Sequence, residues 1–238
     1  MDDLEEFDLN RAPTAARPLL GLTVLVVEDS RFACEAVRLL CLRSGARIRR
    51  ADCLRSARRH LRVYRPSVAI VDLGLPDGSG AELISELAVG VPRIPVLLGT
   101  SGDEFAEDVA VAAGADGFLP KPITSLSGFQ ELVLSLMPPE RQPLGPRPIN
   151  EDEVRPDILA YRDDMAHVAG LLAEGTDDRT IDYVGQFLRG VARSAHDEAL
   201  GAAAETLIEM RQKGRPVVAQ AARIAGMVQQ RIVDRIAI

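Results

Sequence analysis

Short apolar runs, each followed by a polar loop and then by apolar residues at helical spacing, recur between residues 21 and 137. The runs beginning at Leu22, Val68 and Pro95 are almost continuously apolar, which is typical of strands buried on both faces of a parallel sheet. The predicted strands are 22–27, 46–51, 68–72, 95–100 and 117–119. Strands that alternate with helices in this way predict an α/β fold, a doubly wound (βα)5 parallel sheet with helices on both faces.

The predicted helices lie between these strands. Ser30 is a good N-cap for the first helix, and Gly45 is expected to end it. The segment that begins at Leu54 is dense in arginine and stops before Pro66. The expected helices are 31–44, 54–64, 80–88, 103–113 and 123–136.

The pattern changes after residue 150, where only helical periodicity remains. A first helix is expected from Pro156 to Ala173, a long second stretch from Asp177 to Gly214, and a third from Pro216 onward. Their apolar stripes are thin and rich in alanine, so they bury little area on one chain. We therefore expect a helical hairpin or bundle that completes its core against another copy, as a homodimer.

These patterns divide the chain into four parts. Residues 1–20 open with an acidic run and contain two prolines, which predicts a flexible N-terminal tail. Residues 21–137 form the α/β domain, and the proline-rich residues 138–150 are expected to be an extended linker. Residues 151–238 form an all-helical output or dimerisation domain.

Composition narrows the functional classes. The net charge is −7 and no domain has a basic excess, which argues against nucleic-acid binding. No apolar run approaches transmembrane length, and the N-terminus is acidic, so we expect no membrane span and a cytoplasmic protein. The three cysteines, Cys34, Cys41 and Cys53, show no metal-ligand spacing and are expected to be reduced thiols.

Carboxylates stand where two of the buried strands end. Glu28 and Asp29 follow the first strand, and Asp72 ends the third. Carboxylates crowded at one sheet edge repel one another unless a cation joins them, and Mg²⁺ suits such oxygen ligands. Thr100 and Lys121, at two further strand ends, can bind phosphoryl oxygens. An aspartate in such surroundings can accept a phosphoryl group, so the pattern predicts an aspartyl-phosphate site.

Residues 21–137 resemble the receiver domain of two-component response regulators, which has the CheY-like fold. The residues that carry the resemblance are Val26-Val27-Glu28-Asp29-Ser30, Val71-Asp72-Leu73-Gly74-Leu75-Pro76-Asp77-Gly78, Gly99-Thr100-Ser101 and Gly114-Ala115-Asp116-Gly117-Phe118-Leu119-Pro120-Lys121-Pro122. They occur in the family's order and cover about half of the chain. The resemblance implies a phosphoacceptor signalling protein rather than an enzyme.

The resemblance also implies roles for single residues. Asp72 would accept a phosphoryl group from a sensor histidine kinase or a histidine phosphotransfer protein. Glu28, Asp29, Asp72 and the backbone carbonyl of Gly74 would hold Mg²⁺.

Three further roles concern the phosphoryl group and the response to it. Thr100 and Lys121 would bind the phosphoryl oxygens. Phe118 would be the aromatic residue that turns inward when Thr100 moves. The bond between Lys121 and Pro122 would be cis.

The output of the helical half allows three interpretations. The apolar stripes favour an interaction or dimerisation module that responds to phosphorylation. The segment around His196 resembles the phosphotransfer helix of sensor kinases, so a phosphorelay through His196 is an alternative; His167 and His60 are expected to be surface residues. Residues 171–181 resemble the start of a helix-turn-helix, but no basic recognition helix follows, which argues against DNA binding.

The arginine-rich segment 55–62 is a separate feature of the α/β domain. A charged helix face of this kind is usually solvated, and it could also dock an acidic partner.

Overall fold

The computed structural model describes residues 12–103, 105–145, 149–175 and 177–233. Contacts divide the chain into two units. The first comprises residues 1–29 and 34–155, and the second comprises residues 30–33 and 156–238. We describe each unit by itself.

The first unit is built on a five-stranded sheet. Its strands are β1 (Thr23–Val27), β2 (Arg47–Ala51), β3 (Val68–Asp72), β6 (Val96–Ser101) and β7 (Gly117–Pro120). They lie in the order β2-β1-β3-β6-β7, and every neighbouring pair is parallel. The predicted doubly wound parallel sheet is confirmed.

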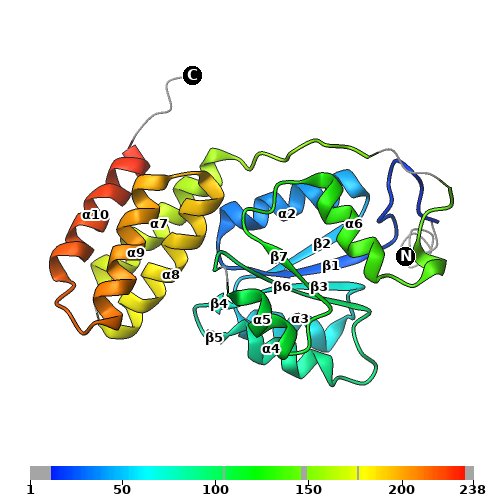
Figure 1. Cartoon of the computed structure of the whole chain (residues 1–238), viewed down its shortest axis with the longest axis horizontal. Helices are drawn as coiled ribbons and strands as arrows, with labels where there is room; N and C mark the ends of the chain where they lie inside the picture. Colours follow the sequence, from blue (N-terminus) through cyan, green and yellow to red (C-terminus); the bar gives the residue numbers. More distant parts are fainter. Residues whose placement is uncertain (1–11, 104, 146–148, 176, 234–238) are drawn as a thin grey trace. The chain divides into compact units, whose positions relative to one another are not determined.

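Helices cover both faces of this sheet (Figure 1). The five are α2 (Arg31–Ser44), α3 (Leu54–Val63), α4 (Gly80–Ala88), α5 (Ala106–Ala112) and α6 (Leu126–Leu136). Residues of α2 and α6 pack with Val26 and Ile70 in one core, whereas residues of α3, α4 and α5 pack with Val27 and Val71 in the other. Successive strand residues point to opposite faces, so one apolar run supplies both cores.

A small antiparallel pair lies in the segment after β3, where the sequence predicted only a tight loop. It consists of β4 (Gly74–Leu75) and β5 (Gly78–Ser79). Gly78 has a positive φ of 154°, which favours glycine. The pair turns the chain back from the end of β3 into α4.

The structure corrects two of the predicted boundaries of the α/β domain. The flexible tail was expected to reach residue 20, but Leu19 is fully buried in a core of the first unit and donates from its amide to the Ser44 carbonyl. The earlier acidic positions, up to residue 11, lie outside the described residues. At the other boundary, Val154 was assigned to the helical domain but is buried in the same core, and its amide donates to the Thr124 carbonyl.

The predicted linker is also more structured than a simple spacer. A short 3-10 helix, η1 (Pro139–Arg141), follows α6. The Gln142 side-chain amide donates to the carbonyls of Leu134 and Met137, so this stretch is tied to the end of α6. Composition alone missed these contacts because proline-rich segments lack a periodic apolar signal.

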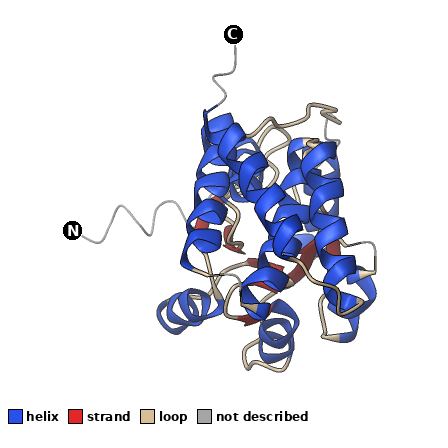
Figure 2. Ribbon diagram, turned by 90° about the vertical axis from the view of Figure 1, so that its left-hand side faces the viewer, coloured by secondary structure: helices blue, strands red, loops and turns tan. Residues whose placement is uncertain are grey.

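The second unit contains four helices: α7 (Ile158–Glu174), α8 (Asp178–Ala195), α9 (Glu198–Gln212) and α10 (Val218–Val233). Figure 2 shows only helices and connections in the described part of residues 156–238. The prediction of one long helix from 177 to 214 is wrong. His196 has a left-handed backbone with φ of 55°, and the Asp197 carboxylate caps α9 by accepting from the Leu200 amide at 3.0 Å.

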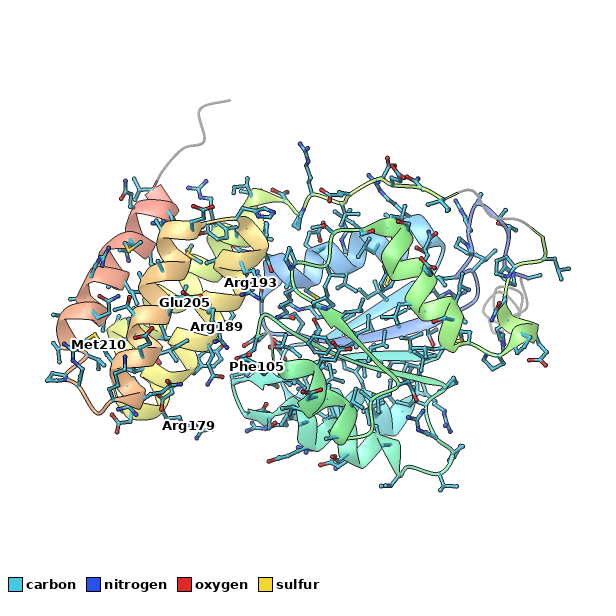
Figure 3. The ribbon with its side chains drawn as sticks, viewed as in Figure 1. Phe105, Arg179, Arg189, Arg193, Glu205 and Met210 are labelled. Atoms are coloured by element: carbon cyan, nitrogen blue, oxygen red, sulfur yellow. The ribbon has the colours of Figure 1, made fainter. Side chains whose placement is uncertain are left out.

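The four helices close a core of their own. Met165, Ile181, Val184 and Leu188 are among its residues, each at most 1% exposed. Polar side chains such as Arg179, Arg193 and Glu205 lie on the outside of α8 and α9 (Figure 3). A fourth helix supplies what a helical hairpin lacks, so the described helices share a buried core within one chain. The expected homodimer stays a prediction.

Residues 30–33 belong to this second unit. The buried Asp164 carboxylate of α7 accepts hydrogen bonds from the Ser30 hydroxyl at 2.7 Å and from the amides of Arg31 and Phe32. The Phe32 ring packs edge-on against Tyr161 at 5.8 Å between ring centres. The first amides of a helix have no partner within that helix. In α2 they are bound by a carboxylate more than 130 positions away.

In the described part of the chain, no helix is both long enough and apolar enough to span a membrane. Cys34, Cys41 and Cys53 form no disulfide bond in the described part of the chain. Burial raises the pKa of the Cys41 thiol to about 12, so this side chain is a neutral core residue.

Candidate functional site

The residues predicted to form the site lie at the carboxyl ends of four neighbouring strands. Asp72 is the last residue of β3, Glu28 and Asp29 follow β1, Thr100 lies near the end of β6, and Lys121 follows β7. The order β1-β3-β6-β7 makes these ends adjacent. This edge of an open parallel sheet is where α/β proteins place their sites.

Lys121 links two of the carboxylates. Its ammonium group lies 2.7 Å from a Glu28 carboxylate oxygen and 2.9 Å from an Asp72 carboxylate oxygen. All three side chains are buried, with Lys121 only 7% exposed. The amide of Lys121 donates to the Ser101 carbonyl at 2.9 Å, which fixes where the side chain starts.

Burial and charge act on these groups in opposite directions. Burial raises the pKa of Glu28 well above its usual value; the Lys121 ammonium opposes this shift, and the nearby Asp72 and Asp29 add to it. Burial alone would lower the pKa of Lys121, but the carboxylates of Asp72 and Glu28 outweigh it and raise that pKa. The ammonium group of Lys121 therefore stays charged.

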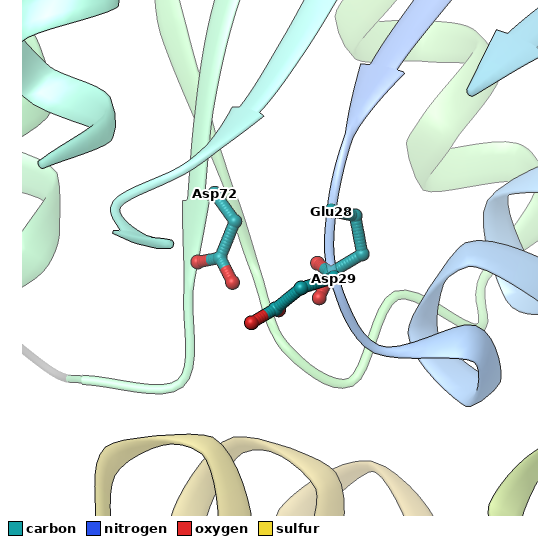
Figure 4. Close-up of side chains that lie close together, drawn as sticks. All are labelled: Glu28, Asp29 and Asp72. Atoms are coloured by element: carbon teal, nitrogen blue, oxygen red, sulfur yellow. The ribbon is translucent and has the colours of Figure 1, made fainter. Parts of the chain in front are cut away.

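The carboxylates of Glu28, Asp29 and Asp72 converge on one point (Figure 4). One ligand oxygen from each lies within 4.8 Å of the other two. Three hard oxygen donors balanced by a single ammonium suit a small divalent cation such as Mg²⁺, so the residues present fit such an ion. The Gly74 amide, 3.4 Å from the Asp72 carboxylate, belongs to the same loop.

Thr100 and Phe118 lie next to Asp72 through the strand register. Thr100 is the direct partner of Asp72 between β3 and β6, and its hydroxyl donates to the Leu119 carbonyl at 2.7 Å. Phe118 is partly buried and packs against the core shared by α3, α4 and α5. The Lys121–Pro122 peptide bond is cis, as the resemblance implied.

Two residues beside the site were not identified from the sequence. The guanidinium of Arg50, at the end of β2, donates to the carbonyls of Glu28 and Asp29, at 3.4 and 3.0 Å. The Asp77 carboxylate accepts from the amides of Leu54 and Arg55 at 2.8 and 3.0 Å and so caps α3. In the sequence, Arg50 is one arginine among many, and Asp77 has the appearance of a turn residue.

Among the described residues, the acidic cluster contains no histidine. His196 is exposed at the end of α8 rather than on a continuous helix face. His167 is exposed on α7 and contacts the rings of Tyr183 and Phe187, in agreement with its prediction as a surface residue. His60 packs edge-on against Tyr64 in the first unit.

Comparison with known proteins agrees with the geometry. The sequence model of the response regulator receiver domain matches residues 24–132. Residues 24–132 are a receiver domain. The site lies at the ends of this domain's strands, and the four helices of the second unit lie outside the match.

Curated relatives match over the same region. The "probable transcriptional regulatory protein TcrX" of Mycobacterium tuberculosis is 35% identical over 116 residues, which are 48% of each chain. The "virulence transcriptional regulatory protein PhoP" of Salmonella typhimurium is 35% identical over 102 residues, which are 42% of this chain and 46% of the relative. The chain spans about half the length of these relatives, so the similarity concerns the receiver domain alone.

Solved structures match this half of the chain as well. A response regulator structure from Chloroflexus aurantiacus is 25% identical, with a TM-score of 0.45, and covers 48% of this chain and 96% of its own. The chemotaxis response regulator CheY4 of Vibrio cholerae is 24% identical, with a TM-score of 0.43. The match covers 48% of this chain and 98% of the CheY4 chain.

Proposed function

We propose that this protein is a response regulator whose Asp72 accepts a phosphoryl group from a sensor histidine kinase or a histidine phosphotransfer protein. The observation that carries the proposal is the buried ammonium group of Lys121, which contacts Asp72 and Glu28 at the carboxyl edge of the sheet. In the transfer, an oxygen of Asp72 forms a bond to phosphorus while the bond between phosphorus and the donor imidazole nitrogen breaks. The released imidazole takes up a proton from solvent. The proposal places this exchange in the cytoplasm.

The side chains around Asp72 have separate roles in this step. Glu28, Asp29, Asp72 and the Gly74 carbonyl would hold Mg²⁺, which supplies positive charge next to the phosphoryl oxygens. Lys121 remains charged and pairs with the same oxygens after transfer. The phosphoryl group thus exchanges a carboxylate–ammonium contact for a phosphate–ammonium contact.

The signal follows from the hydrogen bond that Thr100 makes. A phosphoryl group adds about 1.5 to 2 negative charges and three acceptor oxygens at Asp72. These compete with the Leu119 carbonyl for the Thr100 hydroxyl, and the movement of Thr100 gives Phe118 room to turn inward. Allosteric couplings of this kind are typically about 1–3 kcal/mol, so phosphorylation shifts an equilibrium rather than forcing one state.

The proposed output is a change in protein–protein interaction or dimerisation that involves the helical unit. Near Asp72, the changing surface would be the one formed by α5 and α6, where Phe105 is 80% exposed and Val109 51% exposed (Figure 3). Exposed apolar residues of this kind favour a protein partner. Light scattering on the full chain, with and without phosphorylation, should show a change in mass or in partner binding that Asp72→Asn abolishes.

The phosphoacceptor is tested by incubating the full chain with acetyl phosphate and Mg²⁺. We expect the intact mass to increase by one phosphoryl group, and we expect the increase to disappear in Asp72→Asn and after chelation of Mg²⁺. Asp77→Asn is the matched control, because it changes a carboxylate that caps α3, and it should keep the label. Full labelling of Asp72→Asn would contradict the proposal.

Two further measurements distinguish the alternative functions. A label that disappears in His196→Ala when phosphorylated receiver is the donor would favour a phosphorelay. Sequence-specific DNA binding that persists at moderate salt would favour transcriptional regulation, which is the function stated for the relatives.

A further inference from the structure

We propose that an arginine face on the first unit is the docking site for the chain's own acidic N-terminal segment, residues 2–8. The arginine face consists of exposed side chains on the edge strand β2, on α3 and just after it: Arg49, Arg55, Arg59, Arg62 and Arg65. This proposal is independent of phosphorylation at Asp72.

The arginine face is a strong concentration of charge in an acidic protein. Residues 47–65 contain eight arginines and a single acidic residue, Asp52, whereas the whole chain has a net charge of −7. Arg55, Arg59 and Arg62 have the spacing i, i+4, i+7, so they lie along one side of α3. Like charges at this spacing destabilise a helix, and a bound anionic segment would relieve the repulsion.

Among the described residues, only part of the charge on the arginine face has a partner group nearby. Arg58 pairs with Glu86 at 2.6 Å, and the Arg49 guanidinium lies over the Tyr64 ring at 5.7 Å. Among the described residues, Arg59, Arg62 and Arg65 make no ion pair. The arginine face therefore has at least three cations available for an acidic ligand.

The N-terminal segment matches the arginine face in charge and in reach. Its carboxylates are Asp2, Asp3, Glu5, Glu6 and Asp8. The described chain begins at Ala12, and the side chain of Arg17 lies against Gly45, two residues before β2 begins. Eleven residues can span about 36 Å, and the five residues of β2 cover only about 17 Å. Residues 2–8 therefore have enough chain length to extend along the edge strand that carries Arg49.

Covalent attachment explains how weak contacts suffice. Exposed ion pairs are individually weak, but a short tether gives the segment an effective concentration on the order of millimolar. In the sheet formed by the described residues, β2 is also an edge strand. Salt screens exposed charges, and the Debye length falls to about 3 Å at about 1 M ionic strength. Docking through these charges should therefore weaken strongly at high salt.

Zero-length carbodiimide cross-linking tests the proposal, because it joins a carboxylate to a lysine and the native chain has only Lys121 and Lys213. The variant Arg59→Lys keeps the charge and adds a reactive amine on the arginine face. Arg223→Lys, at an exposed position on α10, is the matched control. Mass spectrometry of the full chain should find residues 2–8 linked to position 59, with a yield that falls about fivefold in 0.5 M NaCl.

Mixing isotopically light and heavy chains shows whether the segment comes from the same copy or from a second one. We expect links within one copy only, and a link mainly between copies would overturn the proposal. A yield no higher than that of Arg223→Lys would overturn it. Salt-sensitive binding of duplex DNA that is lost in Arg55→Gln/Arg59→Gln/Arg62→Gln, together with absence of the cross-link, would also overturn it and assign the arginine face to nucleic acid.

Discussion

Arg50 shows how one residue outside the predicted set can control the site. Its guanidinium donates to the backbone carbonyls of Glu28 and Asp29, which carry two of the three converging carboxylates. Hydrogen bonds from a charged donor are stronger than neutral ones, so this contact fixes the chain where it leaves β1. Arg50 is thus a positioning residue for the acidic cluster.

Replacement of Arg50 tests this role. We expect Arg50→Gln to weaken Mg²⁺ binding about fivefold, which corresponds to about 1 kcal/mol, because the carbonyls of Glu28 and Asp29 lose their donor. Isothermal titration calorimetry on the full chain measures the change. Arg49→Gln is the control: it removes the same charge from the neighbouring position and should leave binding unchanged or slightly tighter. Tighter binding in both variants would show that Arg50 acts only through its charge.

At the scale of elements, close packing around the end of β3 determines the shape of the site. A Cβ atom on Gly80, the first residue of α4, would lie 1.9 Å from the Asp72 carbonyl oxygen. The helix can therefore start beside Asp72 only because this position lacks a side chain.

Gly80→Ala should destabilise the protein by about 1–3 kcal/mol and lower its phosphorylation rate, since the backbone at Asp72 must move. Urea unfolding and labelling with acetyl phosphate provide the two measurements. Gly170→Ala is the control, because Gly170 lies inside α7 with nothing within 4 Å of an added Cβ. It should stabilise by about 0.5–1 kcal/mol. An unaffected Gly80→Ala would contradict the packing argument.

The second unit is held by a polar network as well as by its core. The Asp197 carboxylate accepts from the Tyr161 hydroxyl at 2.6 Å and from the Nε and Nη2 groups of Arg231, and these contacts join α7, α9 and α10. The hydrogen bonds from Arg231, followed by those from Tyr161 and the Leu200 amide, outweigh burial and lower the pKa of Asp197 to about 2.

This shift predicts a pH dependence. A carboxylate whose pKa is lowered by folding stabilises the protein above its unfolded pKa near 4, and that contribution is lost as the pH falls towards 2. Asp197→Asn should lower the melting temperature at pH 7, and the difference from wild type should shrink between pH 4 and pH 2. Asp178→Asn breaks an exposed ion pair with Arg211. This variant should change the melting temperature little, both at pH 7 and at pH 2.

At the scale of the whole molecule, the chain has separate apolar cores in its two units. The sheet cores contain Leu98 and Leu97, whereas the helical core contains Leu188, and all three are fully buried. Among the described residues, these cores are separate clusters of buried apolar side chains.

We expect Leu188→Ala to cost about 2–5 kcal/mol in the helical unit and to leave phosphorylation of Asp72 intact. Hydrogen exchange measured by mass spectrometry should show faster exchange in α7 to α10 and unchanged protection in the sheet. Leu98→Ala should do the reverse and reduce labelling. If Leu188→Ala abolished the label, the two units would have to fold as one.

Local sequence patterns were enough to predict the sheet, its helices and the convergence of five side chains: Glu28, Asp29, Asp72, Thr100 and Lys121. These features can be predicted locally, because apolar runs, turn residues and strand ends are recognised from residues close together in the sequence. The order of parallel strands then brings the ends together, so the candidate site was predictable before any coordinates.

The features that join distant positions could not be predicted in this way, because they depend on the folded arrangement. The break at His196, the burial of Leu19 and Val154, the fourth helix that closes the helical core, and the contacts of Arg50, Asp77 and Asp164 all depend on which residues meet in space. A carboxylate that caps a helix from more than 130 residues away leaves no local pattern. An exposed arginine and one that binds two carbonyls are likewise identical in sequence, because the difference lies in the fold around them.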